Sequence, residues 1–323
     1  MPEIPEIRAH AERLETLAAG EVLKRVEPLS FTAFKTASPQ PSDAVGWPLC
    51  SVGQRAKFLL LRFARPTQDP AGGGAGRRGS IGADGGDGGG NHADGGDHAD
   101  GDNRGDGLTF VVHLMQGGRL RVLEAGAKRP RRPRDGLVRF EFDSGLGLML
   151  TEPGTQKRAG VWVLDGDVAD AEPITGLGPE ATELDADGMA ELMSMHSGRL
   201  HNFLRDQRVI SGLGRRLANE ICHRAKLSPF ASVGRLDADA VGRVVAAIEA
   251  VVDESLAFER GRPEMSRAAE RPSAVHGRTG EPCVACDEVV RAVDYRDYSV
   301  NYCASCQTGG RVLADNTTSK FLR

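Results

Sequence analysis

The feature that most constrains this chain is a set of four cysteines near its C-terminal end. Cys283 and Cys286 form one Cys-x-x-Cys pair, and Cys303 and Cys306 form a second pair after sixteen intervening residues. Two such pairs can converge on one tetrahedral Zn²⁺, with each thiolate about 2.3 Å from the metal. Disulfide bonds are the alternative, but the N-terminus shows no secretory signal, which favours metal. We therefore predict a finger of two hairpins that holds one structural zinc ion.

The length and composition indicate a protein of two or three domains. The chain has 323 residues, of which 40% are hydrophobic, enough to form real cores. No apolar run approaches the roughly 18 residues of a membrane span, so we expect no membrane association. The first residues contain neither a basic nor an apolar signal region, which predicts a cytoplasmic location. The two remaining cysteines, Cys50 and Cys222, are expected to be small packed residues.

The net charge of −4 is unevenly distributed along the chain. Residues 66–107 contain eight Asp and three Arg, a net charge of −5, so the remaining residues carry +1. Basic residues gather in two runs, 128–134 and 205–226. A local basic patch is what binds phosphate groups, although each run is equally compatible with a solvated face.

The first half of the chain predicts one helix followed by a β-sandwich. Apolar residues recur at helical spacing over residues 2–19, with Glu3 and Glu6 in the first turn, where the helix dipole favours acids. Short runs with two-residue periodicity then follow, separated by turn signals. We predict eight strands, at 22–26, 31–34, 57–63, 108–115, 120–123, 138–142, 146–150 and 161–164. Together they predict a two-layer sandwich in a first domain, residues 1–165.

Residues 66–107 interrupt this pattern. The segment has sixteen Gly together with Asp, Asn and His, and almost no apolar residue. Such a sequence cannot bury enough surface to offset its ordering entropy, so we predict a disordered insertion in a hairpin loop. His92 and His98 could hold a metal weakly, but solvated filler is the simpler interpretation.

The second half is predicted to be helical and to end in the finger. Candidate helices are 185–196, 199–210, 214–226 and 237–258, in a domain over residues 166–262. A glycine-rich turn with Gly212 and Gly214 leads into a helix that begins with Arg215. Free N–H groups at such a helix start suit a backbone phosphate, and a plain helix–helix turn is the alternative. Residues 263–323 hold a linker and the finger, where 289–293 and 298–302 predict a β-ribbon.

These features, in this order, resemble the family of formamidopyrimidine-DNA glycosylases and endonuclease VIII. Local matches are Pro2-Glu3-Ile4-Pro5-Glu6, Gly53-Gln54-Arg55-Ala56-Lys57-Phe58-Leu59-Leu60, Leu177-Gly178-Pro179-Glu180 and Leu204-Arg205-Asp206-Gln207-Arg208-Val209-Ile210-Ser211-Gly212-Leu213-Gly214. The resemblance covers nearly the whole chain except the insertion. It implies an α+β multidomain protein with an N-terminal helix, a β-sandwich, a helix-two-turn-helix domain and a C-terminal zinc finger.

The resemblance also implies a covalent mechanism. After removal of Met1, the secondary amine of Pro2 would attack C1′ of a damaged nucleoside and form an iminium ion, which permits elimination of the 3′-phosphate. Glu3 would supply or take protons, and Lys57 would contact phosphate at the lesion. Taken alone, Glu3 could be a first-turn helix charge and Lys57 an exposed strand residue.

Several positions depart from the formamidopyrimidine type, and they all concern damage reading. Met115 and Gln116 stand where that type has a void-filling Met, and Lys157 and Arg158 lie in a stretch without its aromatic wedge. Arg215 replaces the family Asn after the glycine turn. In the finger, Tyr298 occupies the position of the family arginine, so Arg296 or Arg311 would serve as substitute.

The sequence therefore predicts a bifunctional DNA glycosylase and abasic-site lyase that acts as a monomer on double-stranded DNA containing oxidised bases or abasic sites. Its location would be the cytoplasm, at the nucleoid. The departures lean towards abasic DNA or oxidised pyrimidines over 8-oxoguanine. Two alternatives stay open: a zinc-finger protein that binds damaged or abasic DNA with weak or no catalysis, and a structural metal-binding module unrelated to DNA.

Overall fold

The structure, a computed structural model, describes residues 1–66, 107–127, 133–166 and 168–313. Its first element is the helix α1 (Ile4–Ala18), which packs against strand β2 (Leu49–Arg55) and against the long helix α5 (Ala238–Arg260). Nearly all of the predicted insertion, with His92 and His98, and most of the basic run 128–134 lie outside the described residues. Among the residues that are described, no helix combines the length and apolar character needed to cross a membrane.

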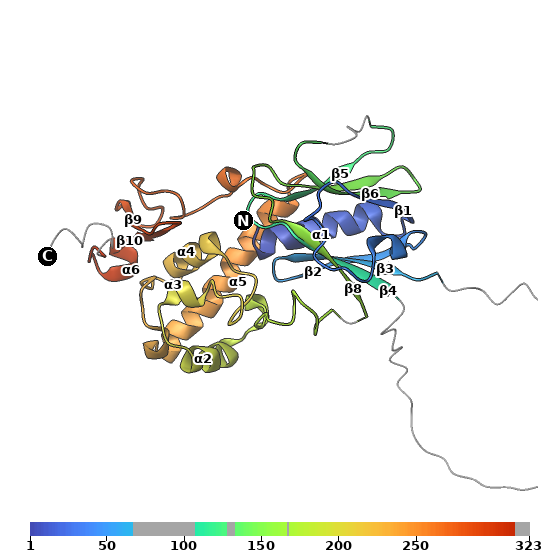
Figure 1. The fold of residues 1–323 in the computed structure, drawn as a ribbon. Coiled ribbons are helices and arrows are strands. Elements are labelled where there is room, and N and C mark those ends of the chain that lie inside the picture. The colour runs from blue at the N-terminus through green and yellow to red at the C-terminus, as the bar shows by residue number, and fades with distance from the viewer. Residues whose placement is uncertain (67–106, 128–132, 167, 314–323) are drawn as a thin grey trace, which may run out of the picture.

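A sandwich of two four-stranded antiparallel sheets follows α1 (Figure 1). One sheet has the order β1 (Leu23–Pro28), β6 (Gly136–Phe142), β7 (Gly147–Thr151), β5 (Arg119–Leu123). The other has the order β2 (Leu49–Arg55), β3 (Phe58–Ala64), β4 (Gly107–His113), β8 (Gly160–Asp165). Between the layers, the ring of Phe110 meets Phe140 of the opposite sheet edge-to-face at 5.7 Å. The predicted sandwich is confirmed.

Two details of the predicted strands are wrong. Residues 31–34 form no strand, because Phe31 is fully exposed and Phe34 makes only an isolated bridge to Val161. The strand β2 was missed, because Ser51, Gly53 and Gln54 interrupt the apolar alternation there. Cys50, on β2, is exposed, so the prediction of a packed residue is also wrong for it, whereas Cys222 is buried.

The helical part contains α2 (Ala186–Met195), α3 (Leu200–Phe203), α4 (Arg215–Arg224) and α5 (Ala238–Arg260). Short 3₁₀ turns lie at Pro41–Ala44, Ala181–Glu183, Val233–Arg235 and Ala268–Glu270. The helix predicted over 199–210 ends much earlier, at Phe203. Beyond it, the Gln207 side chain accepts a hydrogen bond from Gly212 N at 3.1 Å and donates one to Leu213 O at 2.7 Å. These bonds stabilise a loop in place of further helix.

The two cores meet at the N-terminus of α1. Ile4 packs into the helical core with Leu213 and Leu217, while Ile7 belongs to the core of the sandwich. The backbone N–H of Ile4 also donates to Gly212 O at 3.0 Å. The first turn of α1 is therefore built from both halves of the molecule.

The C-terminal finger packs on α4. It consists of β9 (Val290–Asp294), β10 (Ser299–Cys303) and the short helix α6 (Ala304–Thr308). The two strands pair antiparallel, as the predicted ribbon requires. The side chain of Gln307 anchors the finger to the helical part by donating to Leu227 O at 2.9 Å. The domain borders near residues 165 and 262 remain a prediction.

Candidate active site

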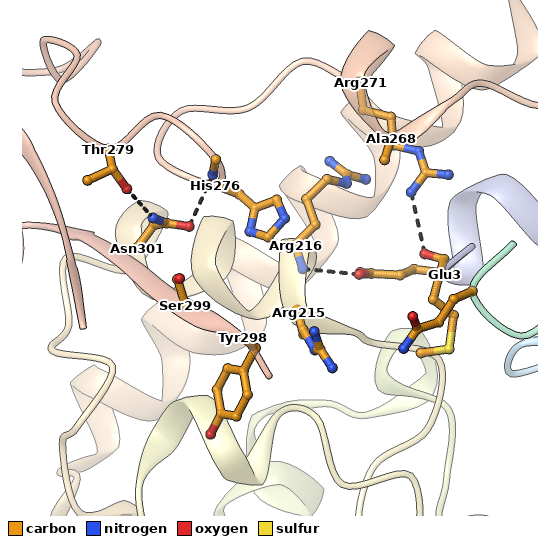
Figure 2. A pocket seen from close by; sticks show the side chains of 13 residues that line it. Glu3, Arg215, Arg216, Ala268, Arg271, His276, Thr279, Tyr298, Ser299 and Asn301 are labelled. Atoms are coloured by element: carbon orange, nitrogen blue, oxygen red, sulfur yellow. Dashed lines mark hydrogen bonds between the residues drawn. The ribbon is translucent and has the colours of Figure 1, made fainter. Parts of the chain in front are cut away.

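A cavity of about 410 Å³ lies where the N-terminus, the start of α4 and the finger meet (Figure 2). Its wall includes Met1, Glu3, Gln116, Arg215, Arg216, Ala268, Arg271, His276, Gly277, Thr279, Tyr298, Ser299 and Asn301. Three arginines and one carboxylate thus line a space beside the chain terminus. This is a setting suited to an anionic ligand.

Glu3 is fixed in this cavity by the first turn of α4. Its carboxylate accepts hydrogen bonds from the backbone N–H groups of Arg216, at 3.1 Å, and Leu217, at 3.0 Å. The sequence analysis predicted the N–H groups at this helix start as a phosphate site. Two of them donate to Glu3, and the contact of the turn with a phosphate stays a prediction. A helix N-terminus stabilises any nearby negative charge, so a carboxylate satisfies it as well as a phosphate.

The glycine-rich turn makes this approach feasible. Gly212 has a φ of +96°, a left-handed conformation that favours glycine. At Gly214, a Cβ atom would lie 2.4 Å from Glu3 Oε1. Both glycines therefore act by letting the backbone approach α1, and their predicted direct contact with DNA stays a prediction.

Glu3 and Lys57 lie near enough for each charge to shift the pKa of the other. Burial by itself would raise the pKa of Glu3, but the charges of Lys57 and Arg216 and the two N–H bonds outweigh it, so the pKa is lowered. Lys57 is 4% exposed, and burial lowers its pKa to about 8, with Glu3 opposing the shift. Near pH 7 the site therefore holds an ionised carboxylate beside a mostly charged amine.

A second, buried carboxylate, Glu6, binds the backbone and the arginines around Glu3. It accepts the backbone N–H of Glu3 at 2.6 Å and pairs with Arg216 at 3.3 Å and Arg271 at 3.2 Å. Arg271 in turn donates to the carbonyl oxygen of Met1 at 3.4 Å. Burial, together with the charge of Arg271, lowers the pKa of the Met1 amino group. The chain terminus is thus held at the cavity. Met1 lines it, and Pro2, the next residue in the chain, is buried.

Lys57 is held in place by the turn between β2 and β3. Ala56, at φ +51°, precedes it, and its N–H donates to the buried carboxylate of Glu180. Arg55 ties the same turn to the helical part through Gly178 O, at 2.9 Å, and through Glu180, at 3.3 Å. Residues 177–180 therefore hold the turn that precedes Lys57 in place.

His276 is a lining residue that the sequence analysis missed. Glu220 accepts the backbone N–H groups of Ala274, Val275 and His276 and so fixes the loop. Figure 2 shows the imidazole between Asn301 and Arg216. No sequence signal marked this residue, because it lies in the linker ahead of the first cysteine pair.

The protonation of His276 follows from a chain of hydrogen bonds. Gly277 N can only donate, and it donates to Asn301 Oδ1 at 3.0 Å. That oxygen also faces Asn219 Nδ2 at 3.3 Å, and the same amide donates to His276 Nδ1 at 2.8 Å. Nδ1 is therefore an acceptor, and the neutral ring carries its proton on Nε2. Burial lowers the pKa of His276, so this neutral form prevails near pH 7.

The predicted DNA-binding residues are only partly brought together. Gln116 and Arg215 line the cavity, and Met115, at φ +49°, occupies the turn just before Gln116. Lys157 and Arg158 lie in the loop between β7 and β8, where Lys157 Nζ donates to Arg134 O at 2.8 Å.

In the finger, Arg296 and Arg311 are exposed and lie apart from the cavity wall. Tyr298, at the position of the family arginine, lines it instead. Which of the three serves the DNA contact of the finger stays a prediction.

The four finger cysteines form a site that can hold a metal ion. Their sulfur atoms all lie within 4.8 Å of one another, and Cys286 Sγ lies 3.4 Å from the sulfurs of both Cys303 and Cys306. Tetrahedral coordination at about 2.3 Å places sulfurs roughly 3.8 Å apart, so the cluster fits one ion. The side chain of His223 on α4 lies 3.2 Å from Cys283 Sγ and can donate to that thiolate.

Comparison with known proteins identifies the family. Residues 1–159 match the model of the formamidopyrimidine-DNA glycosylase N-terminal domain. An uncharacterized formamidopyrimidine-DNA glycosylase-like protein of Mycobacterium tuberculosis is 38% identical over 149 residues, which cover 94% of that relative and 46% of this chain. The chain belongs to the formamidopyrimidine-DNA glycosylase family.

Other members of the formamidopyrimidine-DNA glycosylase family match over nearly the full length. The enzyme of that name from Novosphingobium aromaticivorans is 28% identical over 318 residues, covering 95% of this chain and all of the relative. Solved structures of the family share the fold. MutM (Fpg) from Thermus thermophilus aligns with a TM-score of 0.69 at 21% identity, covering 95% of this chain and 98% of that one. Lactococcus lactis Fpg in complex with abasic-site DNA aligns at 0.72 and 17%, covering 95% and 99%.

Proposed function

We propose that this chain is a DNA glycosylase of base excision repair that excises oxidised bases and cleaves the strand at abasic sites, with Pro2 as its covalent nucleophile. The observation that carries the proposal is the cavity at the N-terminus. There Glu3 accepts two backbone N–H groups of α4, and its negative charge acts on the pKa of Lys57. The family relatives support the same activity, because several carry the name formamidopyrimidine-DNA glycosylase.

In the proposed reaction, removal of Met1 leaves the imino group of Pro2 as the terminus. An α-amino group has a pKa of about 8, so a usable neutral fraction of the amine is available near pH 7. The nitrogen forms a bond to C1′ as the C1′–base bond breaks and the base leaves with the electron pair. Loss of the amine proton and opening of the sugar ring give an iminium ion.

The iminium ion then acts as an electron sink. It acidifies C2′, a base removes that proton, and the C3′–O bond breaks so that the 3′-phosphate leaves. Glu3 is ionised in the resting site, so it can accept a proton first and return it later. Its negative charge also stabilises the positive charge that develops on the sugar and the iminium ion. Lys57, charged near pH 7, would contact the phosphate at the lesion.

For the substrate, we propose duplex DNA with an abasic site or an oxidised pyrimidine ahead of 8-oxoguanine. Gln116 occupies the cavity wall where the formamidopyrimidine type has its void-filling residue, and a polar side chain fills a vacated base position differently from a methionine. We further propose that the four finger cysteines hold one structural Zn²⁺ and that the protein works as a monomer at the nucleoid in the cytoplasm.

Borohydride trapping tests the proposal. Oligonucleotide duplexes, each with one defined lesion, are incubated beside an abasic control and analysed for strand cleavage and for a covalent adduct. Wild type should give the adduct, and Pro2→Gly and Glu3→Gln should lose it. Glu12→Gln is the matched control, because Glu12 lies on the same helix in an exposed pair with Arg260. Duplex binding without any adduct in wild type would instead support a DNA-binding protein without turnover.

A further inference from the structure

Two arginines pack on one tyrosine ring at the edge of the cavity. The guanidinium carbon of Arg205 lies 4.4 Å from the centre of the Tyr298 ring, and that of Arg215 lies 5.2 Å from it. Arg205 precedes the glycine turn, Arg215 opens α4 and Tyr298 precedes β10. We refer to these three residues as the arginine–tyrosine clamp. It joins the helical part to the finger (Figure 2 labels Arg215 and Tyr298).

The two guanidinium groups of the clamp are not neutralised within the described part of the chain. Arg216 and Arg271, the other cavity arginines, both pair with Glu6. In contrast, neither Arg205 nor Arg215 has a carboxylate within ion-pair distance among the described residues. Arg205 Nη1 is also buried and has no hydrogen-bond partner there. A buried donor without a partner, and two like charges held on one ring, are both unfavourable until an anion binds them.

The orientation of Arg215 is set by the finger. Its Nη1 donates to the carbonyl oxygen of Asp297 at 2.9 Å, next to Tyr298. The Tyr298 ring stacks on Tyr295 at 4.8 Å and lies nearly parallel to His201 at 6.3 Å. The ring is therefore already in contact with four neighbours. It supports the two guanidinium groups, since cations pack favourably against an aromatic face.

The clamp lies beside the proposed reaction centre. Arg215 and Tyr298 line the same cavity as Glu3 and Met1, and the charge of Arg205 contributes to the lowered pKa of Lys57. A nucleotide placed with its sugar at the terminus brings a phosphodiester group on each side. Guanidinium groups match the oxygens of such a group in a bidentate manner.

We propose that Arg205 and Arg215 together bind a single phosphodiester group of the DNA strand at the cavity, and that Tyr298 is the positioning residue that holds both guanidinium groups for it. The inference rests on the proposed function in one respect only, that DNA is the ligand. It assigns to Arg215 and Arg205 the cationic contact that would otherwise be sought at Arg296 or Arg311.

The test measures binding to a duplex with a tetrahydrofuran abasic-site analogue over a series of salt concentrations. Arg205→Gln and Arg215→Gln should each weaken binding about tenfold, and loss of both should reduce the slope of log K against log salt by about 1, because one phosphate contact is lost. If both arginines share one phosphate, the double variant should lose clearly less than the product of the single losses. Arg208→Gln is the control, because Arg208 is exposed in the same segment.

Tyr298 variants separate positioning from charge. Tyr298→Phe keeps the ring and should bind as wild type does. Tyr298→Leu removes the support and should weaken binding several-fold with an unchanged salt slope, because the number of charges is the same. Melting temperatures identify any variant that fails to fold, and Arg215→Lys, which keeps the charge and so should keep the slope, serves as the milder replacement.

The outcomes distinguish this inference from the proposed function. Unchanged affinity and slope in both Gln variants, or fully multiplicative losses in the double variant, would overturn the shared phosphate site while trapping at Pro2 persists. If wild type gives no trapped adduct while the arginine variants change affinity and salt slope as predicted, the lyase chemistry is overturned and the phosphate site stands. Salt-independent or absent duplex binding by wild type would overturn both.

Discussion

The carboxylate of Glu3 accepts the backbone N–H of Leu217 at 3.0 Å, although the two residues are 214 positions apart in the chain. This bond, with its neighbour from Arg216, makes the proposed acid–base residue also the cap of α4. The N-terminal end of α1 and the helical part are consequently stabilised by the same carboxylate.

Gly214→Ala should strongly reduce activity by displacing the carboxylate of Glu3. The new Cβ would lie 2.4 Å from Glu3 Oε1 and 2.5 Å from its carboxyl carbon, so the carboxylate must move. We expect an activity loss on the order of 100-fold, since displacement by about 1 Å has effects of this size, and a stability loss of about 1–3 kcal/mol. Cleavage assays and urea unfolding measure the two effects. Gly242→Ala in α5, where no atom lies within 4 Å, should keep activity and add up to about 1 kcal/mol.

Lys57 should make stability depend on alkaline pH. Its pKa is about 8 in the folded protein, against 10.5 as the ordinary value. Between these values the unfolded chain keeps a proton that the folded protein has released, so the free energy of unfolding rises with pH. Relative to Lys57→Met, wild type should gain about 3 kcal/mol from pH 8 to pH 10.5. Urea unfolding of both proteins over this range measures the gain, and parallel curves would show that the lysine is not buried as described.

His223→Phe should weaken metal binding in the finger while leaving all four cysteines in place. His223 Nε2 lies 3.2 Å from Cys283 Sγ, where it can donate its N–H to a metal-bound thiolate. Loss of such a supporting bond typically costs about 10–100-fold in metal affinity. Competition for zinc with a chromophoric chelator measures it. Arg224→Ala, an exposed neighbour paired with Glu254, should leave zinc affinity unchanged.

Glu180→Ala should destabilise the turn that carries Lys57. The buried carboxylate accepts the N–H of Ala56 and pairs with Arg55 at 3.3 Å and Arg8 at 3.6 Å. Removal leaves the N–H of Ala56 without its acceptor and both arginines without this carboxylate, at a cost of about 3 kcal/mol. Glu254→Ala breaks an exposed pair and should cost at most about 1 kcal/mol. Equal melting temperatures for the two variants would contradict this account.

Replacement of residues 66–106 by a short Asn-Gly loop should leave the fold intact. Ala64 pairs directly with Gly107 in the register of β3 and β4, so the two strand ends already meet. A tight hairpin turn suits such a register, and a shorter loop has a smaller closure entropy. The shortened protein should melt at or slightly above the temperature of wild type and should trap abasic DNA equally well. A large loss of stability would mean that the segment packs on the domain.

The sequence predicted what depends on local pattern. The α1 helix, seven of the strands, the finger ribbon and the cysteine cluster followed from periodicity and spacing. It failed where tertiary contacts decide: β2 contains Ser51, Gly53 and Gln54 among its residues, and α3 stops because Gln207 bonds to the following loop.

Within the site, sequence reasoning found the individual residues but not their arrangement. Glu3 and the glycine turn were each noted in the sequence. Only the fold shows that the Glu3 carboxylate packs on Gly214 and accepts the N–H of Arg216 just after the turn. Likewise, Arg215 and Tyr298 were recorded as separate departures from the family, whereas in space they touch. Contacts between distant segments leave no trace in a single sequence, and His276 was missed for the same reason.

The division of α1 between two cores has a final consequence. Ile4 is buried by the helical part and Ile7 by the sandwich, and the carboxylate between them depends on α4. A fragment ending at residue 165 would keep α1 and both sheets, but the first turn of α1 would lack its contacts with α4 and with the helical core. The proposed reaction therefore requires the helical part of the chain, because α4 holds the N-terminal turn and its carboxylate in place.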